Sequence, residues 1–206
     1  MSSSTQVKVY FWGTEGPLVL LLAGVHGDET GPIDFFTNMV KHGIFFNDDN
    51  KFRLAIIPCA NPCGYYASNR YDCEGKDINR SWLMPNSDLK SWIDQADIIY
   101  DFHEAHKTWR QNDLGRSIYI THPEYCAMII KKITTELNLL RPNLIDKWIY
   151  MSRVTNYEGK TLDEYCIKNN KLYVLIEFLR SDSLENKAED LQTIIHSLFE
   201  KTVLFL

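Results

Sequence analysis

The chain has 206 residues, of which 45% are hydrophobic and 24% charged, an ordinary composition for one globular domain covering residues 1–206. Its formal net charge of −5 argues against a nucleic-acid partner, which would require a basic surface. No apolar run reaches the roughly 20 residues of a membrane span, and the N-terminus lacks the features of a signal peptide, so we expect a cytoplasmic protein without a membrane partner.

The cysteines are expected to be reduced. The chain has five, an odd number, and no export signal, which favours free thiols over a disulfide framework. Cys59, Cys63 and Cys73 are close in sequence, but no CxxC pair occurs. We therefore expect scattered, neutral thiols rather than a cysteine zinc site.

Apolar stretches alternate with amphipathic ones along the chain. Pro17–Val25 is a continuous apolar run, which is typical of a strand buried on both faces. In chain order we predict a strand at 7–12, a strand at 17–25, a helix at 31–42, a strand at 52–59, a polar segment at 61–85, a helix at 89–95, a strand at 96–102, a strand at 117–121, a helix at 123–140, a helix at 161–169, a strand at 171–178 and a helix at 184–204. This alternation predicts an α/β fold, a three-layer sandwich with a mixed, mostly parallel central sheet flanked by helices.

Polar residues follow the predicted strands at the point where each one ends. Ligands of open α/β sheets bind beyond the carboxyl ends of the strands, so these residues should gather at one edge. Glu177 is the most informative, because a carboxylate within VLIEF is costly to bury without a partner or a task. The residues at strand ends are His26 and Glu29, Asn61 and Arg70, His103, and Glu177.

His26 and Glu29 form an HxxE pair, whose members share a face at the start of a helix. Catalytic zinc sites use three nitrogen or oxygen ligands and keep a position open, and His103 would complete such a set. HxxE alone is a weak signal, because the same two residues could lie in a solvent-exposed turn without binding a metal. In DFHEAH, Glu104 and His106 also compete with His103, which we prefer because it lies at the strand end.

Several segments occur in an order that resembles the zinc carboxypeptidase family, the M14 metallopeptidases. They are LLLAGVHGDE, NPCGYYASNR, GKDINRSW, DFHEAH and NYEGKTLDEYC followed by YVLIEF. The match is nearest to the compact bacterial murein-tripeptide amidases that cut γ-D-glutamyl-diaminopimelate bonds, and it extends over about residues 20–178. The resemblance implies the zinc carboxypeptidase (phosphorylase/hydrolase-like) fold.

The resemblance also implies a role for each matching residue. These roles are His26, Glu29 and His103 as ligands of one Zn²⁺, Arg70 as the residue that polarises the scissile carbonyl, Asn79 and Arg80 as a clamp for the substrate's terminal carboxylate, Tyr157 as a mobile tyrosine with Tyr150 as the substitute, Leu162 as a selectivity position, and Glu177 as the general base. Two positions depart from the family pattern, since Cys63 replaces an aspartate and Trp82 a phenylalanine.

The implied function is a zinc metallocarboxypeptidase that hydrolyses a peptide or amide bond next to a free terminal carboxylate, for instance in a small cell-wall-derived peptide. The alternative is an N-acyl-amino-acid deacylase of the succinylglutamate desuccinylase/aspartoacylase type. Those enzymes usually carry a further C-terminal β-domain, whereas only about 30 residues follow Glu177 here, so we rank the peptidase first. A second alternative is a non-catalytic carboxylate-binding module, which metal content and turnover would distinguish.

Overall fold

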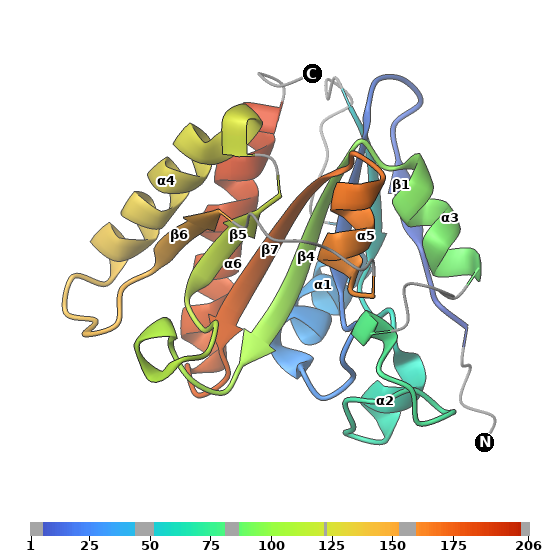
Figure 1. Ribbon diagram of the computed structural model, residues 1–206, viewed down its shortest axis with the longest axis horizontal. Coiled ribbons are helices and arrows are strands. Elements are labelled where there is room, and N and C mark those ends of the chain that lie inside the picture. Colours follow the sequence, from blue (N-terminus) through green and yellow to red (C-terminus); the bar gives the residue numbers. More distant parts are fainter. Residues whose placement is uncertain (1–5, 44–51, 81–86, 122, 153–159, 203–206) are drawn as a thin grey trace.

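The computed structural model describes residues 6–43, 52–80, 87–121, 123–152 and 160–202. A seven-stranded sheet in the order β1-β3-β2-β4-β7-β5-β6 runs through them (Figure 1). The strands are β1 (Tyr10–Trp12), β2 (Leu18–Ala23), β3 (Arg53–Ile57), β4 (Ile98–Ala105), β5 (Ser117–Ile120), β6 (Ile149–Ser152) and β7 (Leu172–Leu179).

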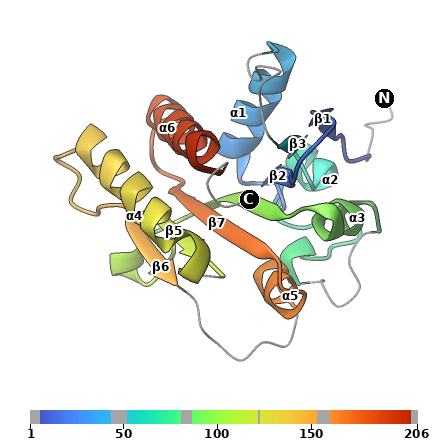
Figure 2. The ribbon, with the colours of Figure 1, turned by 90° about the horizontal axis from the view of Figure 1, so that it is seen from above.

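Helices cover both faces of the sheet. Seen from above in Figure 2, α1, α4 and α6 lie on one face, and α3 and α5 lie on the other. The helices are α1 (Thr30–Lys41), α2 (Pro62–Tyr66), α3 (Ser87–Gln95), α4 (Pro123–Leu140), α5 (Leu162–Lys168) and α6 (Leu184–Thr202), with 3-10 turns η1 (Ile78–Arg80) and η2 (Trp109–Gln111). The predicted three-layer α/β sandwich is confirmed.

The four central strands are mutually parallel. β2 pairs in parallel with both β3 and β4, and β4 pairs in parallel with β7. β1 is antiparallel to β3, and β5 is antiparallel to β7, while β6 runs parallel to β5. The carboxyl ends of β2, β3, β4 and β7 therefore lie at the same edge of the sheet, as we expected for a mostly parallel sheet.

Alternating side chains of the central strands fill two cores. Every residue of β2 is buried. Val19 and Leu21 pack with residues of α1, α4 and α6, whereas Leu20 and Leu22 pack with residues of α3 and α5. A strand covered on both faces needs apolar residues at every position, which explains the unbroken apolar run in the sequence.

Some elements differ from the prediction. β4 extends to Ala105, so His103 lies within the strand rather than after it. The first strand covers only Tyr10–Trp12. β6 and α2 were not predicted, because both are short and carry no periodic pattern of their own.

The expectation of reduced thiols is wrong for one pair. Cys63 and Cys73 form a disulfide with a Cα–Cα distance of 5.5 Å, which is within the usual range. α2 turns the chain so that these two residues meet, and the sequence spacing does not reveal that turn. Among the described residues, Cys59 and Cys166 are free thiols. Within the same residues, no helix combines the length and the apolar composition needed to cross a membrane.

Candidate metal centre and cleft

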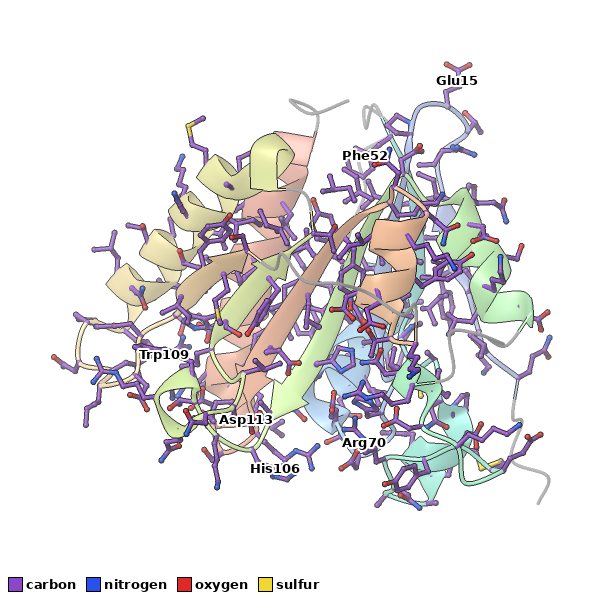
Figure 3. All side chains as sticks on the ribbon, viewed as in Figure 1. Glu15, Phe52, Arg70, His106, Trp109 and Asp113 are labelled. Atoms are coloured by element: carbon purple, nitrogen blue, oxygen red, sulfur yellow. A yellow bond between two sulfur atoms is a disulfide. The ribbon has the colours of Figure 1, made fainter. Side chains whose placement is uncertain are left out.

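The polar residues at strand ends gather at the predicted edge of the sheet. β4 and β7 bring His103 and Glu177 to opposing positions in their parallel ladder. In Figure 3 the labelled side chains of Arg70 and His106 lie near the edge where β4 and β7 end. Residues from four separate strand ends thus share one region, as the sequence predicted.

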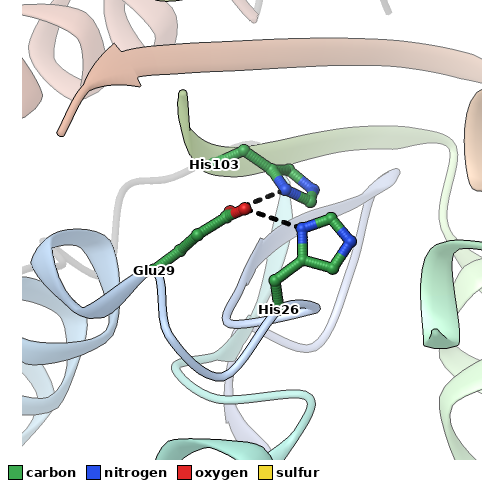
Figure 4. A group of neighbouring side chains, drawn as sticks. All are labelled: His26, Glu29 and His103. Atoms are coloured by element: carbon green, nitrogen blue, oxygen red, sulfur yellow. Dashed lines mark hydrogen bonds and ion pairs between the residues drawn. The ribbon is translucent and has the colours of Figure 1, made fainter. Parts of the chain in front are cut away.

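His26, Glu29 and His103 form a compact buried group (Figure 4). His26 Nδ1 lies 2.7 Å from Glu29 Oε1, and His103 Nδ1 lies 2.9 Å from Glu29 Oε2. One potential ligand atom from each residue lies within 4.8 Å of the others. Two imidazoles and one carboxylate, converging in this way, are the donor set of a three-ligand catalytic zinc site.

The outer nitrogen of each histidine is held by an aspartate. His26 Nε2 lies 3.3 Å from Asp77 Oδ1, and His103 Nε2 lies 2.9 Å from Asp101 Oδ2. Metal-binding histidines commonly pair their second nitrogen with a carboxylate in this way, which fixes the ring so that its other nitrogen faces the metal. Both Nδ1 atoms face the same carboxylate, so the residues present fit a divalent metal ion.

The charges of the group support the same conclusion. Burial opposes ionisation of Glu29, but His103 and His26 outweigh it and lower the pKa of Glu29 below its usual range. Burial likewise opposes protonation of His103, yet Asp101 and Glu29 raise the pKa of His103 well above its usual range. The carboxylates thus create a site that favours positive charge, which a metal ion can supply in place of protons.

Two glycines shape the loop that carries His26. Gly24 has a φ of +67°, a conformation that L side chains rarely adopt. Gly27 lies so close to α2 that a Cβ atom would be 2.1 Å from the carbonyl carbon of Gly64. Glu29 then caps α1, and its N–H donates to the carbonyl of His26 at 3.3 Å. This tight turn brings the HxxE side chains together before the helix begins.

Glu177 is buried on β7, where it is paired with His103 on β4. Burial raises the pKa of its carboxyl to about 8, with His103 opposing the shift and Glu29 and Asp101 adding to it. A carboxyl with a raised pKa beside a possible metal site has the properties of a general base.

Arg70, Asp77 and Asn79 form a connected polar chain. Arg70 Nε donates to Asp77 Oδ2 at 2.9 Å, and Arg70 Nη1 lies 3.9 Å from Glu29 Oε1. The N–H of Asn79 donates to Asp77 Oδ1 at 2.9 Å. Burial opposes ionisation of Asp77, but His26 and Arg70 together lower its pKa below the usual range. One aspartate therefore joins a metal-facing histidine to the arginine beside it.

A cleft of about 320 Å³ opens beside this group, and a second cavity of about 370 Å³ adjoins it. The residues that line both are Arg80, Leu114, Asp163, Tyr173 and Leu175. Arg80 is exposed, and so is His106, which also lines the cleft. Asp28 also lines the cleft, where it forms an ion pair of 3.0 Å with Arg180.

Two expected substrate contacts need correction. Leu162 is fully buried among residues of α3 and the sheet, because the first turn of α5 points it inward, and its neighbours Thr161 and Asp163 line the cleft instead. Tyr150, the substitute for the mobile tyrosine, packs on the core beneath α4, and Lys131 lies over its ring. Tyr157 and Trp82 lie outside the described residues.

Three residues of the site were missed in the sequence. Asp77 stands two residues before Asn79, and Asp101 two residues before His103 on the same face of β4. Asp101 also accepts the hydroxyl hydrogen of Tyr173. The period of two in a strand could have identified Asp101, whereas Tyr173 is recognisable only once β4 and β7 are paired.

Comparison with known proteins identifies the family to which the chain is similar. A family model for the succinylglutamate desuccinylase/aspartoacylase catalytic domain matches residues 15–143. The succinylglutamate desuccinylase of Yersinia enterocolitica is 28% identical over 161 residues, which are 63% of this chain and 48% of that protein. The chain thus spans about half the length of this curated relative.

Solved structures share the fold at low sequence identity. The tripeptide-bound cell shape determinant protein Csd4 from Helicobacter pylori superposes with a TM-score of 0.74, at 17% identity, covering 95% of this chain and 55% of that one. A metallo-carboxypeptidase from Burkholderia cenocepacia has a TM-score of 0.67, also at 17% identity, covering 96% and 61%. The expected α/β fold, shared with metallocarboxypeptidases, is therefore confirmed. By its sequence the chain belongs to the succinylglutamate desuccinylase/aspartoacylase catalytic domain family.

Proposed function

We propose that the protein is a zinc-dependent hydrolase that cleaves an amide bond next to a free carboxylate of its substrate. The observation that carries the proposal is the buried convergence of His26, Glu29 and His103 beside Glu177, at one end of a cleft that also contains Arg70 and Arg80. The same arrangement argues against a carboxylate-binding module, because a module would need neither the histidines nor the buried Glu177.

His26, Glu29 and His103 would hold the zinc, which would supply a polarised carbonyl and a more acidic water when bound. Glu177 takes a proton from the attacking water and delivers it to the leaving amine. General acid–base catalysis of this kind contributes about 10²- to 10⁴-fold to the rate.

The arginines have separate tasks in this proposal. Arg70, held by Asp77, donates to the oxygen on which negative charge develops. Arg80 binds the substrate carboxylate, for which its planar fork is suited. Asn79 assists with its amide nitrogen, since its amide oxygen already accepts the N–H of Leu162 at 3.1 Å. Tyr157 remains a proposed mobile contact.

The first candidate substrate is a short peptide with a free terminal carboxylate. The second cavity favours it, because the cleft alone is of the size that a small acyl-amino acid would fill, whereas the two adjoining spaces leave room for a further residue. Arg80 lines both cavities and can therefore meet a carboxylate at their junction.

The second candidate is an N-acyl amino acid with an acidic group. Family membership favours it, since the matched domain is that of desuccinylases and aspartoacylases. This reaction would use the same residues, with the succinyl or acetyl carbonyl in place of the peptide carbonyl. We further propose that residues 1–206 act as one catalytic domain.

A substrate panel on zinc-loaded protein tests the proposal. It should compare muropeptides, C-terminal peptides, succinylglutamate and N-acetyl-aspartate, each at matched concentration, with metal content measured in the same sample. Turnover of a peptide ahead of the acyl amino acids would support the first candidate, and the reverse order the second. Failure to retain stoichiometric zinc would overturn both.

The cytoplasmic location predicted from the sequence stays a prediction. The Cys63–Cys73 disulfide argues against it, because disulfides are rare in reducing compartments.

A further inference from the structure

Arg70 lies inside a covalently closed loop. Cys63, in α2, and Cys73 are ten positions apart and joined by a disulfide, and Arg70 lies between them. In the view of Figure 3, the labelled side chain of Arg70 lies between α1 and the segment around α2. The residue that faces the metal group from this side is thus carried by a cross-linked segment.

The loop is held by hydrogen bonds rather than by an apolar core, and one of them runs from the Tyr65 hydroxyl to Asp34. The carbonyl of Arg70 accepts the side-chain amide of Asn61 at 3.2 Å, and the N–H of Asn69 donates to the carbonyl of Gly64 at 2.8 Å. Most side chains of the loop are exposed, namely Tyr66, Ala67, Ser68, Asn69 and Tyr71. Because these side chains bury little apolar surface, the cross-link adds a restriction on the loop that its hydrogen bonds alone do not supply.

One end of the loop is anchored on the metal centre itself. Gly64 follows Cys63 in α2, and its backbone lies directly against Gly27, the residue after His26. A Cβ atom on Gly64 would lie 2.6 Å from the carbonyl oxygen of Asn69, so the returning chain also packs closely on α2. The disulfide therefore ties the far end of the loop to a part that is fixed relative to His26.

Arg70 reaches from the loop to Asp77 and Glu29, two residues of the candidate site. Arg70 Nε is 2.9 Å from Asp77 Oδ2, and its Nη1 is 3.9 Å from Glu29 Oε1. About a third of the Arg70 side chain is exposed, so burial alone does not fix its position. The position of this guanidinium depends on the path of the backbone around it.

We propose that the Cys63–Cys73 disulfide positions Arg70 at the metal centre, so that turnover follows the thiol–disulfide state of this pair; the inference rests on the proposed function. Cys73 is exposed, so a dithiol can attack there. Reduction breaks the S–S bond, transfers two electrons and two protons to give two thiols, and closes the disulfide of the reductant. His26, Glu29 and His103 lie outside the loop and keep the metal.

The first test compares wild-type protein with the Cys63→Ser/Cys73→Ser double variant, using the substrate found in the panel. We expect kcat to fall about ten-fold or more, approaching the 10²- to 10³-fold cost of removing an oxyanion donor, while zinc stays stoichiometric. Cys59→Ser, a free cysteine outside the loop, should keep wild-type kcat. Wild-type kcat in the double variant would overturn the proposal.

A cycle with Arg70→Ala shows whether the disulfide acts through this arginine. In an Arg70→Ala background, removing both cysteines should change kcat less than two-fold, because the residue to be positioned is gone. An equal loss in both backgrounds would mean that the disulfide supports another part of the protein, and it would overturn the proposal.

Limited trypsin digestion tests the positioning without any activity. Bonds after Arg70 and Lys76 should be cut at least ten-fold faster in the double variant, or in dithiothreitol-treated wild-type protein, while the rest of the chain resists. If the double variant does not fold, the reduced wild-type protein and its reoxidised form replace it. Because the thiolates of the reductant bind zinc, the metal content is measured in both the reduced and the reoxidised protein. Equal rates of cutting in the oxidised and the reduced protein would overturn the proposal that the disulfide positions Arg70. If the rates differ but no substrate of the panel is turned over, only the proposed function is overturned.

Discussion

Tyr173 donates its hydroxyl hydrogen to Asp101 Oδ2 at 2.7 Å, deep between β7 and β4. The same oxygen lies 2.9 Å from His103 Nε2, so one carboxylate oxygen joins a tyrosine to a proposed metal ligand. Asp101 is fully buried and Tyr173 almost so. The hydrogen bond from Tyr173 therefore helps to orient Asp101, and Asp101 in turn orients the imidazole of His103.

Tyr173→Phe should weaken zinc binding about ten-fold, at the lower end of the effect seen when outer partners of metal ligands are removed. The reason is that Asp101 loses one of the two groups that orient it. Competition with a chelator of known zinc affinity measures the change. Tyr65→Phe is the matched control, because its hydroxyl donates to Asp34 rather than to the partners of a metal ligand. Equal zinc affinity in the two variants would refute the role of Tyr173.

Glu177→Gln should retain zinc and lower kcat by about 10²- to 10⁴-fold, since glutamine keeps the shape of the side chain but cannot accept the proton. The measurement is kcat on the panel substrate, together with metal content. A variant that keeps more than a tenth of wild-type kcat would contradict the general-base assignment.

Arg80→Ala should raise KM for substrates with a free carboxylate about 10- to 100-fold, which corresponds to losing a hydrogen bond between charged groups of about 1.5–3 kcal/mol. The same variant should behave like wild type on a substrate whose carboxylate is amidated. Arg110→Ala is the matched control, because this arginine is exposed, stacks on Trp109 and does not line the cleft. An identical loss on amidated substrate would argue against the clamp.

Gly27→Ala should destabilise the protein by about 1–3 kcal/mol, because the added methyl group must displace the backbone of Gly64. Urea unfolding measures the difference in free energy. Gly43→Ala provides a comparison, since its φ of +62° costs about 1 kcal/mol but nothing lies within 4 Å of the new atom. If Gly27→Ala leaves stability unchanged, the packing of α2 on the metal loop is looser than described.

The central strands and the long helices could be predicted from the sequence because their patterns are local. β2 is apolar at all six positions, and α4 begins and ends at the predicted residues Pro123 and Leu140. A strand buried on both faces and a helix with a proline in its first turn are specified by neighbouring residues alone.

The missed elements depend on contacts between distant parts of the chain. β6 has only half-buried or exposed residues and exists because β5 provides a parallel partner. The disulfide needs the turn of α2 to bring Cys63 and Cys73 together. Periodicity within one segment does not contain this information.

The residues of the candidate site show the same difference between features set by local sequence and features set by distant contacts. His26, Glu29, His103 and Glu177 could be selected because each lies near or just after the carboxyl end of a recognisable strand. Leu162 was misplaced because a one-residue rotation of α5 exchanges the buried and the cleft-facing positions.

The reversal of β5 relative to β7 has a consequence for how this protein can diversify. Because β5 runs opposite to its neighbour, Ser117 at its beginning lies beside Glu177, and the segment that leads into β5 contributes Asp113 and Leu114 to the cleft. This wall is therefore a surface loop entering a strand outside the parallel core. Insertions or deletions there can reshape the cleft while the pairing of β2, β4 and β7, and the proposed catalytic groups on these strands, stay intact. A change in the length of this one loop would thus alter which substrates fit the cleft without moving the proposed metal ligands.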